Sequence, residues 1–349
     1  MEILRSVFTD QNFLGAIIAS IIFILIGFLL RRFNIINEHG RKAVNALVMW
    51  VAIPCMAFVA FMSDFRSEDF LANILILVMD SLFYAIVMLI ANLCFLRKEN
   101  HRIYAILVAV GQLTFFSIPL LSSIYADHVS EVLIPGSMMT LPFRFVTYFY
   151  AYLVISSTKI TKETFGKTIR GIFLTPIMIC MIGGLIIWVT QNVTWQVETA
   201  EGTYGFLRID KTLPALFRIF EFGNHMATPL CMLLMGITLG EADFLQALRN
   251  RLAWVIALSR TLLVPSAILG FCLLMQLWHW FDFSEYQLAV LVIGNGAPVG
   301  AVVSVYCDRY NREGYLASNA VFLSTFLSLL SIPACLILVR LCMQMPIFA

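Results

Sequence analysis

The sequence predicts an all-α membrane protein with ten transmembrane helices. Of its 349 residues, 60% are hydrophobic and 13% are charged, whereas a soluble domain carries about 25% charged residues. Apolar segments alternate with charged connectors along the whole chain, and each segment is long enough to cross a hydrocarbon layer about 30 Å thick. The segments fall near residues 13–30, 43–62, 71–96, 103–125, 132–155, 172–191, 223–240, 253–278, 286–307 and 317–340.

The basic residues of the connectors predict the orientation of these spans. The odd-numbered connectors hold fifteen Lys and Arg residues, and the even-numbered ones hold four. The positive-inside rule therefore places the odd-numbered connectors in the cytoplasm and both termini outside. The first apolar segment ends at Arg31 and Arg32 and is long enough for a true span, so no cleavable signal peptide is expected. We expect a multi-pass protein of the cell (plasma or inner) membrane.

The ten spans divide into two groups of five. Residues 1–155 form the first predicted five-helix repeat, residues 156–171 a cytoplasmic linker, and residues 172–349 the second repeat. Because five is an odd number, the second repeat must be inserted upside down, as in the inverted repeats of many secondary transporters. Weak internal similarity supports the division, since Pro54 in the second span and Pro229 in the seventh follow similar residues.

Two spans are interrupted in the middle. Gly294 to Gly300 breaks the ninth span, and Gly111 to Pro119 breaks the fourth. Proline removes a backbone donor and glycine adds backbone freedom, so neither stretch can continue a regular helix. Broken helix is tolerated in a bilayer only where it is buried in protein or lines a wet cavity. Paired breaks in corresponding positions of two halves are typical of a transporter binding site.

The helix ends at these breaks predict an anion-binding site. A helix N-terminus offers free N–H groups and a positive dipole end, and we expect such ends after Ser117 and after Gly296. Neutral side chains beside the breaks add hydrogen-bond donors. The alternative interpretation is a pair of proline kinks that pack against neighbouring helices without a ligand. The candidate substrate-binding residues here are Gln112, Thr114, Ser117, Pro119, Asn295, Gly296 and Pro298.

Three ionisable residues lie deep in predicted spans, namely Asp80, Arg144 and Arg260. Each costs about 2.5–3.5 kcal/mol at the bilayer centre, so it is expected to be paired, hydrated or used. Either arginine could balance a substrate carboxylate, because its planar fork matches that group. As a structural residue, either could instead pair with Asp80 or extend its charged end to a membrane interface.

Ion coupling stays open at this point. A sodium ion could be held by unwound carbonyls with Gln112 or Asn295, a proton could be carried by Asp80, and transport without coupling is a third possibility. Beyond such an ion, no cofactor is expected.

Other classes of function lack their motifs. The sequence has no metalloprotease, nucleophile-elbow, phosphate-loop or dinucleotide-binding pattern in a workable context, so we do not expect an enzyme. Its eight cysteines show no paired C-x-x-C spacing, which argues against a metal site. No Lys/Arg-rich run suggests a nucleic-acid partner. A channel-like or receptor membrane protein without coupled transport is the alternative to a carrier.

The segment from Gly294 to Pro333 resembles the auxin efflux carrier family, which includes prokaryotic malonate and malate permeases and the plant PIN-formed auxin carriers. The resemblance is carried by Ala297-Pro298, by the short charged loop from Asp308 to Glu313, and by the serines and threonine of the last span. It extends over essentially the whole chain. One departure is Gln112, where the family usually has asparagine.

The resemblance implies a ten-span fold in which spans 4 and 9 cross at their broken centres. The substrate site lies beside that crossing and is lined partly by spans 2 and 7, with Pro54 and Pro229. One bundle (spans 3–5 and 8–10) moves against a scaffold (spans 1, 2, 6 and 7). The implied substrate is a small organic carboxylate, malate-like, malonate-like or auxin-like, and the implied assembly is a homodimer in the lipid bilayer.

Overall fold

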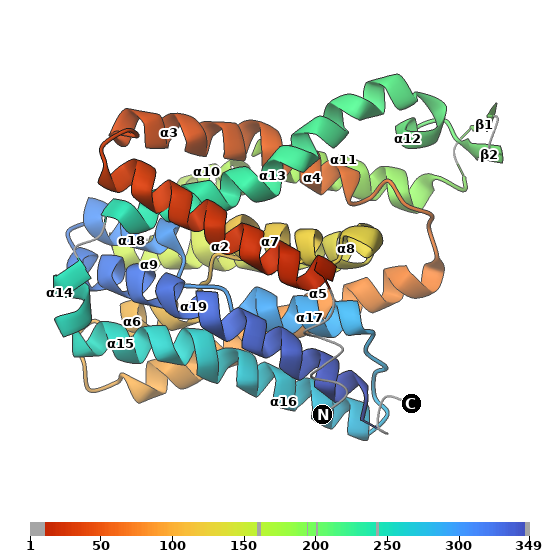
Figure 1. The fold of residues 1–349 in the computed structure, drawn as a ribbon. Coiled ribbons are helices and arrows are strands. Elements are labelled where there is room, and N and C mark those ends of the chain that lie inside the picture. The colour runs from red at the N-terminus through yellow and green to blue at the C-terminus, as the bar shows by residue number, and fades with distance from the viewer. Residues whose placement is uncertain (1–10, 159–161, 194, 200–201, 242–243, 346–349) are drawn as a thin grey trace.

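The structure is a computed structural model that describes residues 11–158, 162–193, 195–199, 202–241 and 244–345. The fold is predominantly helical, and most helices run along one common direction (Figure 1). A small hairpin of β1 (Gln196–Thr199) and β2 (Gly202–Gly205) projects from one end, followed by α12 (Ile209–Thr212). The two strands are antiparallel, with Gln196 opposite Gly205. The chain ends and part of the predicted 156–171 linker lie outside the described residues.

Seven helical segments of the described residues are long and apolar enough to cross a membrane, which makes this a multi-pass membrane protein. Three of them are assembled from shorter pieces. Their components are α2 (Gln11–Arg32); α3 (Glu38–Leu47), η1 (Val48–Ala52) and α4 (Ile53–Val59); α5 (Ser67–Cys94); η3 (Ala126–His128), α8 (Val129–Arg144), η4 (Phe145–Ala151) and α9 (Tyr152–Ser156); α13 (Pro214–Glu241), continuous with its internal Pro229; α15 (Arg251–Leu258), η5 (Ser259–Leu263) and α16 (Val264–Leu277); and α19 (Gly314–Met343).

The other three predicted spans are shorter or broken helices. The fourth consists of α6 (His101–Ala109), η2 (Leu113–Ser117) and α7 (Ile118–Ile124). The ninth consists of α17 (Glu285–Asn295) and α18 (Ala301–Arg309), and the sixth is the 15-residue α11 (Pro176–Thr190). The connectors carry α10 (Lys162–Phe173) and α14 (Phe244–Arg249). The multi-pass character is thus borne out, while the count of ten spans and the inverted repeat stay predictions.

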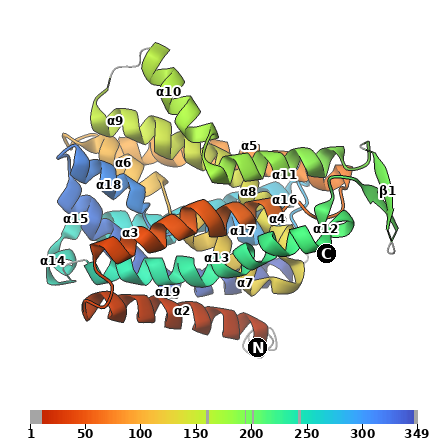
Figure 2. The same ribbon diagram turned by 90° about the horizontal axis from the view of Figure 1, so that it is seen from above.

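The helices pack in two neighbourhoods. Helix α2 runs beside α13 over much of its length, and α13 and α11 both contact α4. In the other neighbourhood α5 contacts α6 and α8, and α19 contacts α15, α17 and α18. In Figure 2, α2, α3 and α13 lie toward one side of the bundle, and α11 lies toward the other side, as α5 does. The broken segments lie between these neighbourhoods, because α13 contacts η2 and α7 as well as α4.

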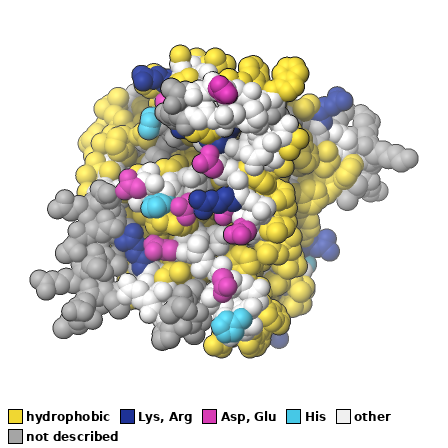
Figure 3. All heavy atoms as spheres, turned by 90° about the vertical axis from the view of Figure 1, so that its right-hand side faces the viewer, with side chains coloured by type: hydrophobic (Ala, Val, Ile, Leu, Met, Phe, Trp, Pro, Cys, Tyr) yellow, Lys and Arg dark blue, Asp and Glu magenta, His cyan; other side chains and the backbone are white. Residues whose placement is uncertain are grey.

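One end of the molecule gathers charged side chains. Figure 3 views this end, and acidic and basic groups occupy its middle beside a hydrophobic flank. Helix α17 begins at the same end, where Arg340 Nε lies 3.2 Å from Glu285 Oε1 and the Tyr125 hydroxyl donates to the same oxygen at 2.9 Å. These pairs join α17, α19 and α7 through polar groups at the end of the bundle.

Three short π-helical turns share one spacing to a proline. The turns η1, η2 and η5 each end two residues before a proline, namely Pro54, Pro119 and Pro265. A proline inside a helix lacks the N–H of one backbone hydrogen bond, and its ring crowds the carbonyl one turn earlier. A wider turn at that place relieves the crowding and lets the helix continue.

Helices α2 and α13 approach each other through glycines. A Cβ added at Gly236 would collide with the carbonyl oxygen of Ile24, and one added at Gly27 would collide with that of Leu233. Gly240 lies four residues after Gly236, on the same face of α13. This arrangement follows the small-residue rule for close helix packing in membranes.

We expect Gly236→Val to destabilise the protein by separating α2 from α13, because backbone atoms oppose the new side chain and cannot move aside. The measurement is the thermal unfolding midpoint of the purified protein in detergent. The matched control is Gly270→Ala in α16, where an added Cβ meets no atom within 4 Å. This control should be neutral or slightly stabilising, by up to about 1 kcal/mol. Equal midpoints for both variants would contradict the packing argument.

Candidate anion-binding site at the crossing of the broken helices

The two interrupted segments meet at their centres. Gly111 and Val299 form an antiparallel β-bridge. The N–H of Gln112 donates to the carbonyl of Pro298 at 2.8 Å, and the N–H of Gly300 donates to the carbonyl of Val110 at 2.9 Å. Backbone groups released by one break are therefore satisfied by the other break, as a buried, water-poor position requires.

The helix ends differ from those expected. Helix resumes at Leu113 in the fourth span and at Ala301 in the ninth, so the predicted N-termini after Ser117 and Gly296 are wrong. In the fourth span only Val110 to Gln112 leave the helix, because a π-helical turn accommodates Pro119 without a further break. In the ninth span the bridge to Gly111 keeps the chain extended up to Gly300.

Three hydroxyl groups satisfy further backbone atoms around the crossing. The Oγ of Ser324, in α19, accepts the N–H of Val299 at 2.9 Å. The hydroxyl of Ser117 donates to the carbonyl of Ile293 at 2.8 Å, which ties η2 to α17. The hydroxyl of Thr228, beside Pro229 in α13, donates to the carbonyl of Pro119 at 2.9 Å. The crossing is thereby tied to α13 as well as to α19.

Arg260 lies at the crossing and is completely buried. Its Nε donates to the carbonyl of Ala297 at 2.9 Å, and its Nη1 donates to the carbonyl of Ala109 at 2.8 Å. These carbonyls belong to opposite broken segments. A charged donor makes stronger hydrogen bonds than a neutral one, so Arg260 is a firm link between the two.

Asp80 and Asn295 form a second buried polar group. Asn295 Nδ2 donates to Asp80 Oδ1 at 2.7 Å and to the carbonyl of Leu291 at 3.1 Å. Across the described residues, neither Arg144 nor Arg260 has a nitrogen within 4.0 Å of the Asp80 carboxylate. The pairing of either arginine with Asp80, one of the alternatives drawn from the sequence, is therefore not seen.

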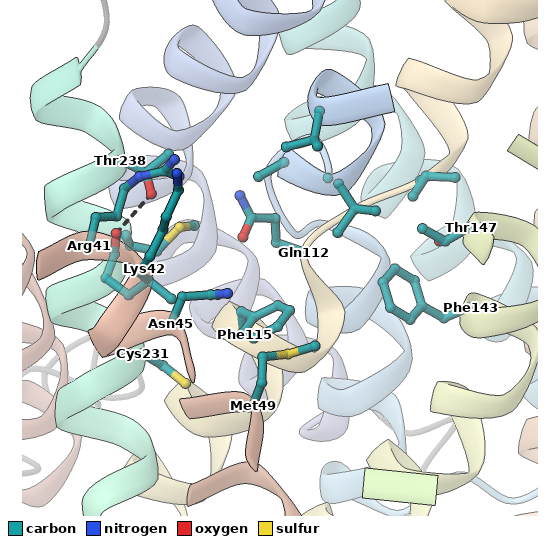
Figure 4. A pocket seen from close by; sticks show the side chains of 18 residues that line it. Arg41, Lys42, Asn45, Met49, Gln112, Phe115, Phe143, Thr147, Cys231 and Thr238 are labelled. Carbon is teal, nitrogen blue, oxygen red and sulfur yellow. Dashed lines mark hydrogen bonds between the residues drawn. The ribbon is translucent and has the colours of Figure 1, made fainter. Parts of the chain in front are cut away.

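A cavity of about 300 Å³ lies against the crossing (Figure 4). This volume is at the lower end of the range for small-molecule sites. Its walls come from α3 and α13 on one side and from both broken segments and α8–η4 on the other. The lining residues are Arg41, Lys42, Asn45, Met49, Val110, Gly111, Gln112, Phe115, Phe143, Thr147, Cys231, Leu234, Met235, Thr238, Gly300, Ala301, Val302 and Val305.

Unpaired donors face this cavity. The Gln112 side chain projects into it (Figure 4), the residue is only 6% exposed, and its Nε2 has no hydrogen-bond partner among the described residues. The hydroxyl of Thr147, in η4, is likewise buried and unpartnered within the described chain. Ala301 and Val302 begin α18, so their N–H groups have no acceptor within the helix. These donors and the positive end of α18 favour a negatively charged guest.

Two basic residues stand at the α3 side of the cavity. Arg41 Nε lies 3.1 Å from Glu241, and Lys42 Nζ lies 2.7 Å from Glu38. Glu241 also pairs with Arg31 at 3.2 Å, so the two arginines share one carboxylate and leave net positive charge there. An anion approaching from this side meets a favourable potential.

The other predicted site residues lie away from this cavity. Thr114 faces a small space beside α4, and its hydroxyl is unpartnered within the described chain. Arg144 is 2% exposed and donates to the hydroxyl of Thr175 at 3.2 Å. Pro54 and Pro229 belong to α4 and α13 without lining the cavity, and Gly296 caps α17. Their roles in substrate binding stay predictions.

Sequence reasoning missed several lining residues. Arg41 and Lys42 were counted only among the basic residues of the odd-numbered connectors. Their position as a basic pair in the first turns of an amphipathic helix is a signal that could have placed them beside a cavity. Thr147 and Phe143 carry no signal, since a threonine or phenylalanine in an apolar span is ordinary. Among the described residues no three His, Cys, Asp or Glu side chains cluster as metal ligands would.

We expect Ser324→Ala to destabilise the crossing, because it leaves the buried N–H of Val299 without an acceptor, a loss of about 1–3 kcal/mol. The control is Ser328→Ala in the same helix. Ser328 is equally buried, but its hydroxyl bonds only the carbonyl of Thr325 within the helix. Thermal unfolding in detergent should show a lower midpoint for the first variant alone. A larger effect at Ser328 would refute the assigned role of Ser324.

Comparison with known proteins agrees with the resemblance seen in the sequence. A search of curated proteins found no match for the chain. A family model described as "Membrane transport protein" matches residues 13–336, which include every helix that lines the cavity. Members of this family are transporters and not enzymes. The chain therefore belongs to the membrane transport protein family, the family of the auxin efflux carriers.

Proposed function

We propose that this protein is a secondary transporter that moves a small organic carboxylate across the membrane. The substrate is malate-like, malonate-like or auxin-like, and it binds in the cavity beside the crossing. Family membership supports transport in general. The carboxylate is inferred from the chemistry of the cavity, which offers donors and positive charge together with apolar walls.

The observation that carries this proposal is the unpaired amide of Gln112. A buried Nε2 without an acceptor is costly unless something fills its place. It lies with the first N–H groups of α18 around one space, and Arg41 and Lys42 border that space on the α3 side. A carboxylate has enough acceptor sites to take hydrogen bonds from Gln112, Thr147 and α18 together.

The transport cycle proposed here is alternating access around the crossing. Ten spans in two inverted repeats, with spans 1, 2, 6 and 7 as scaffold and spans 3–5 and 8–10 as a moving bundle, would place the cavity at the boundary between the two bodies. The packing of α3 and α13 against one side of the cavity supports this division. We further propose a homodimer in the cell membrane, with both termini outside and no nucleic-acid partner.

The test is counterflow in proteoliposomes. Vesicles loaded with an unlabelled dicarboxylate should accumulate the labelled form, with saturation as its concentration rises. A channel-like protein would equilibrate the label without accumulation, and a receptor would bind it without exchange. Either result, obtained with protein that is stabilised by the same acid in a thermal-shift assay, would overturn the proposed carrier function.

We expect Gln112→Leu and Thr147→Val to weaken carboxylate binding by about tenfold each, because each removes one donor worth about 1.4 kcal/mol to a charged ligand. The measurement is the concentration dependence of the thermal shift and of counterflow. The control for Thr147 is Thr190→Val in α11, whose hydroxyl bonds the carbonyl of Ile186 away from the cavity. Unchanged affinity in both cavity variants would move the binding site elsewhere.

A further inference from the structure

Arg260 is placed by a π-helical turn directly at the crossing. It is the second residue of η5, the turn that precedes Pro265, and its side chain is completely buried. Helix α6 ends at Ala109, so its last carbonyls accept no hydrogen bond from within the helix. They form the negative end of the helix dipole. Arg260 Nη1 donates to the carbonyls of Ala109 and Val108, at 2.8 and 3.3 Å.

The same guanidinium also holds the other break. Its Nε donates to the carbonyl of Ala297, which lies in the extended stretch between α17 and α18. One side chain thus gathers carbonyl oxygens from segments that lie about two hundred residues apart in the sequence. An arginine stays charged at every physiological pH, so this cation is permanent.

The surroundings of Arg260 contain no close counter-ion in the described chain. No carboxylate oxygen lies within 4.0 Å of it there, and its Nη2 has no hydrogen-bond partner among the described residues. Asp80 acts on it electrostatically from a greater distance. The positive charge is therefore held mainly by backbone carbonyls, as a bound metal cation would be.

The glycine at position 111 is an independent sign that the backbone there must leave space for the Arg260 guanidinium. A Cβ built at Gly111 would overlap the Arg260 guanidinium. The backbone at Gly111 lies in the bridge to Val299, so it cannot retreat without breaking the crossing. The lack of a side chain at position 111 is thus explained by the close approach of Arg260.

We propose that Arg260 is the positioning residue of the crossing and its built-in cation. In carriers with broken helices, unwound carbonyls and the C-terminal ends of half-helices coordinate sodium. Here those of Val108, Ala109 and Ala297 are taken by the guanidinium. The crossing is therefore assembled without sodium, and, on the proposed transport function, substrate binding at the adjacent cavity does not depend on that ion.

The first experiment measures thermal unfolding of purified protein without substrate, in sodium and in choline buffers. Wild type should have one midpoint in both. Arg260→Met keeps an apolar stem but loses charge and donors, so its midpoint should fall, and Arg260→Lys should recover part of the loss. A wild type stabilised by sodium, or an Arg260→Met variant as stable as wild type, would overturn the proposal.

The second experiment tests whether the three carbonyls prefer a cation. Arg260→Ala frees their space, so millimolar guanidinium chloride or sodium should raise its midpoint, well below denaturing guanidinium concentrations. Arg144→Ala is the control, because Arg144 bonds one threonine hydroxyl and no converging carbonyls in the described chain, and its midpoint should not rise. Rescue of neither variant, or of both equally, would count against the role of Arg260. If Arg260→Ala cannot be purified, Gly111→Ala, which displaces the guanidinium, should show the same loss of stability as Arg260→Met.

Substrate binding is measured separately, as the dissociation constant of the carboxylate in sodium and in choline buffers. For wild type the two constants should be equal. For Arg260→Met binding should be at least about tenfold weaker than for wild type, a change of about 1.4 kcal/mol. If no carboxylate binds wild type while Arg260→Met still loses stability, the proposed function fails and the role of Arg260 stands. A sodium requirement for binding would refute the built-in cation alone.

Discussion

Freed backbone groups at two helix breaks must find partners where water is scarce, and this requirement shapes the centre of the molecule. Each break supplies partners to the other: the N–H of Gln112 donates to the carbonyl of Pro298, and the N–H of Gly300 donates to the carbonyl of Val110. Two further backbone groups are satisfied by side chains. Ser324 accepts the N–H of Val299, and Arg260 donates to the carbonyl of Ala297. Because an unsatisfied group would cost several kcal/mol in hydrocarbon, neither break is stable without the other.

The negative and positive helix ends at the crossing have different partners. The negative helix end at Ala109 and the carbonyl of Ala297 are occupied by Arg260, a group of the protein itself. The positive end of α18 instead faces a cavity, together with the unpaired amide of Gln112. In the candidate anion site, backbone dipoles and amides therefore supply donors beside the crossing, and Arg41 and Lys42 line the α3 side of the same cavity.

Much of this organisation can be predicted from the sequence, because it rests on residues with strong backbone preferences. Gly111, Pro119 and the Gly294 to Gly300 stretch mark both breaks, and apolar segment lengths mark a multi-pass chain. The helix end in the fourth span was misplaced because a π-helical turn before a proline leaves no trace in composition. The end in the ninth span was misplaced because the bridge to Gly111, a contact between distant residues, keeps the chain extended up to Gly300. Thr147 and Ser324 could not be found either, since a lone hydroxyl in an apolar span gains its meaning only from what packs against it. For Arg260 the depth was evident from sequence, but its partners are backbone carbonyls, which no side-chain pattern can reveal.

The π-helical turns before Pro54, Pro119 and Pro265 have a geometric consequence. Each winds one surplus residue into its helix, and a single residue corresponds to about 100° of rotation in an ordinary α-helix. The surplus therefore fixes which side of α4, α7 and α16 looks inward. Losing one residue from such a turn would leave a helix of normal pitch whose remaining length had swivelled by more than a quarter circle. The prolines, with the π-helical turns before them, thus determine the rotation of these three helices about their own axes.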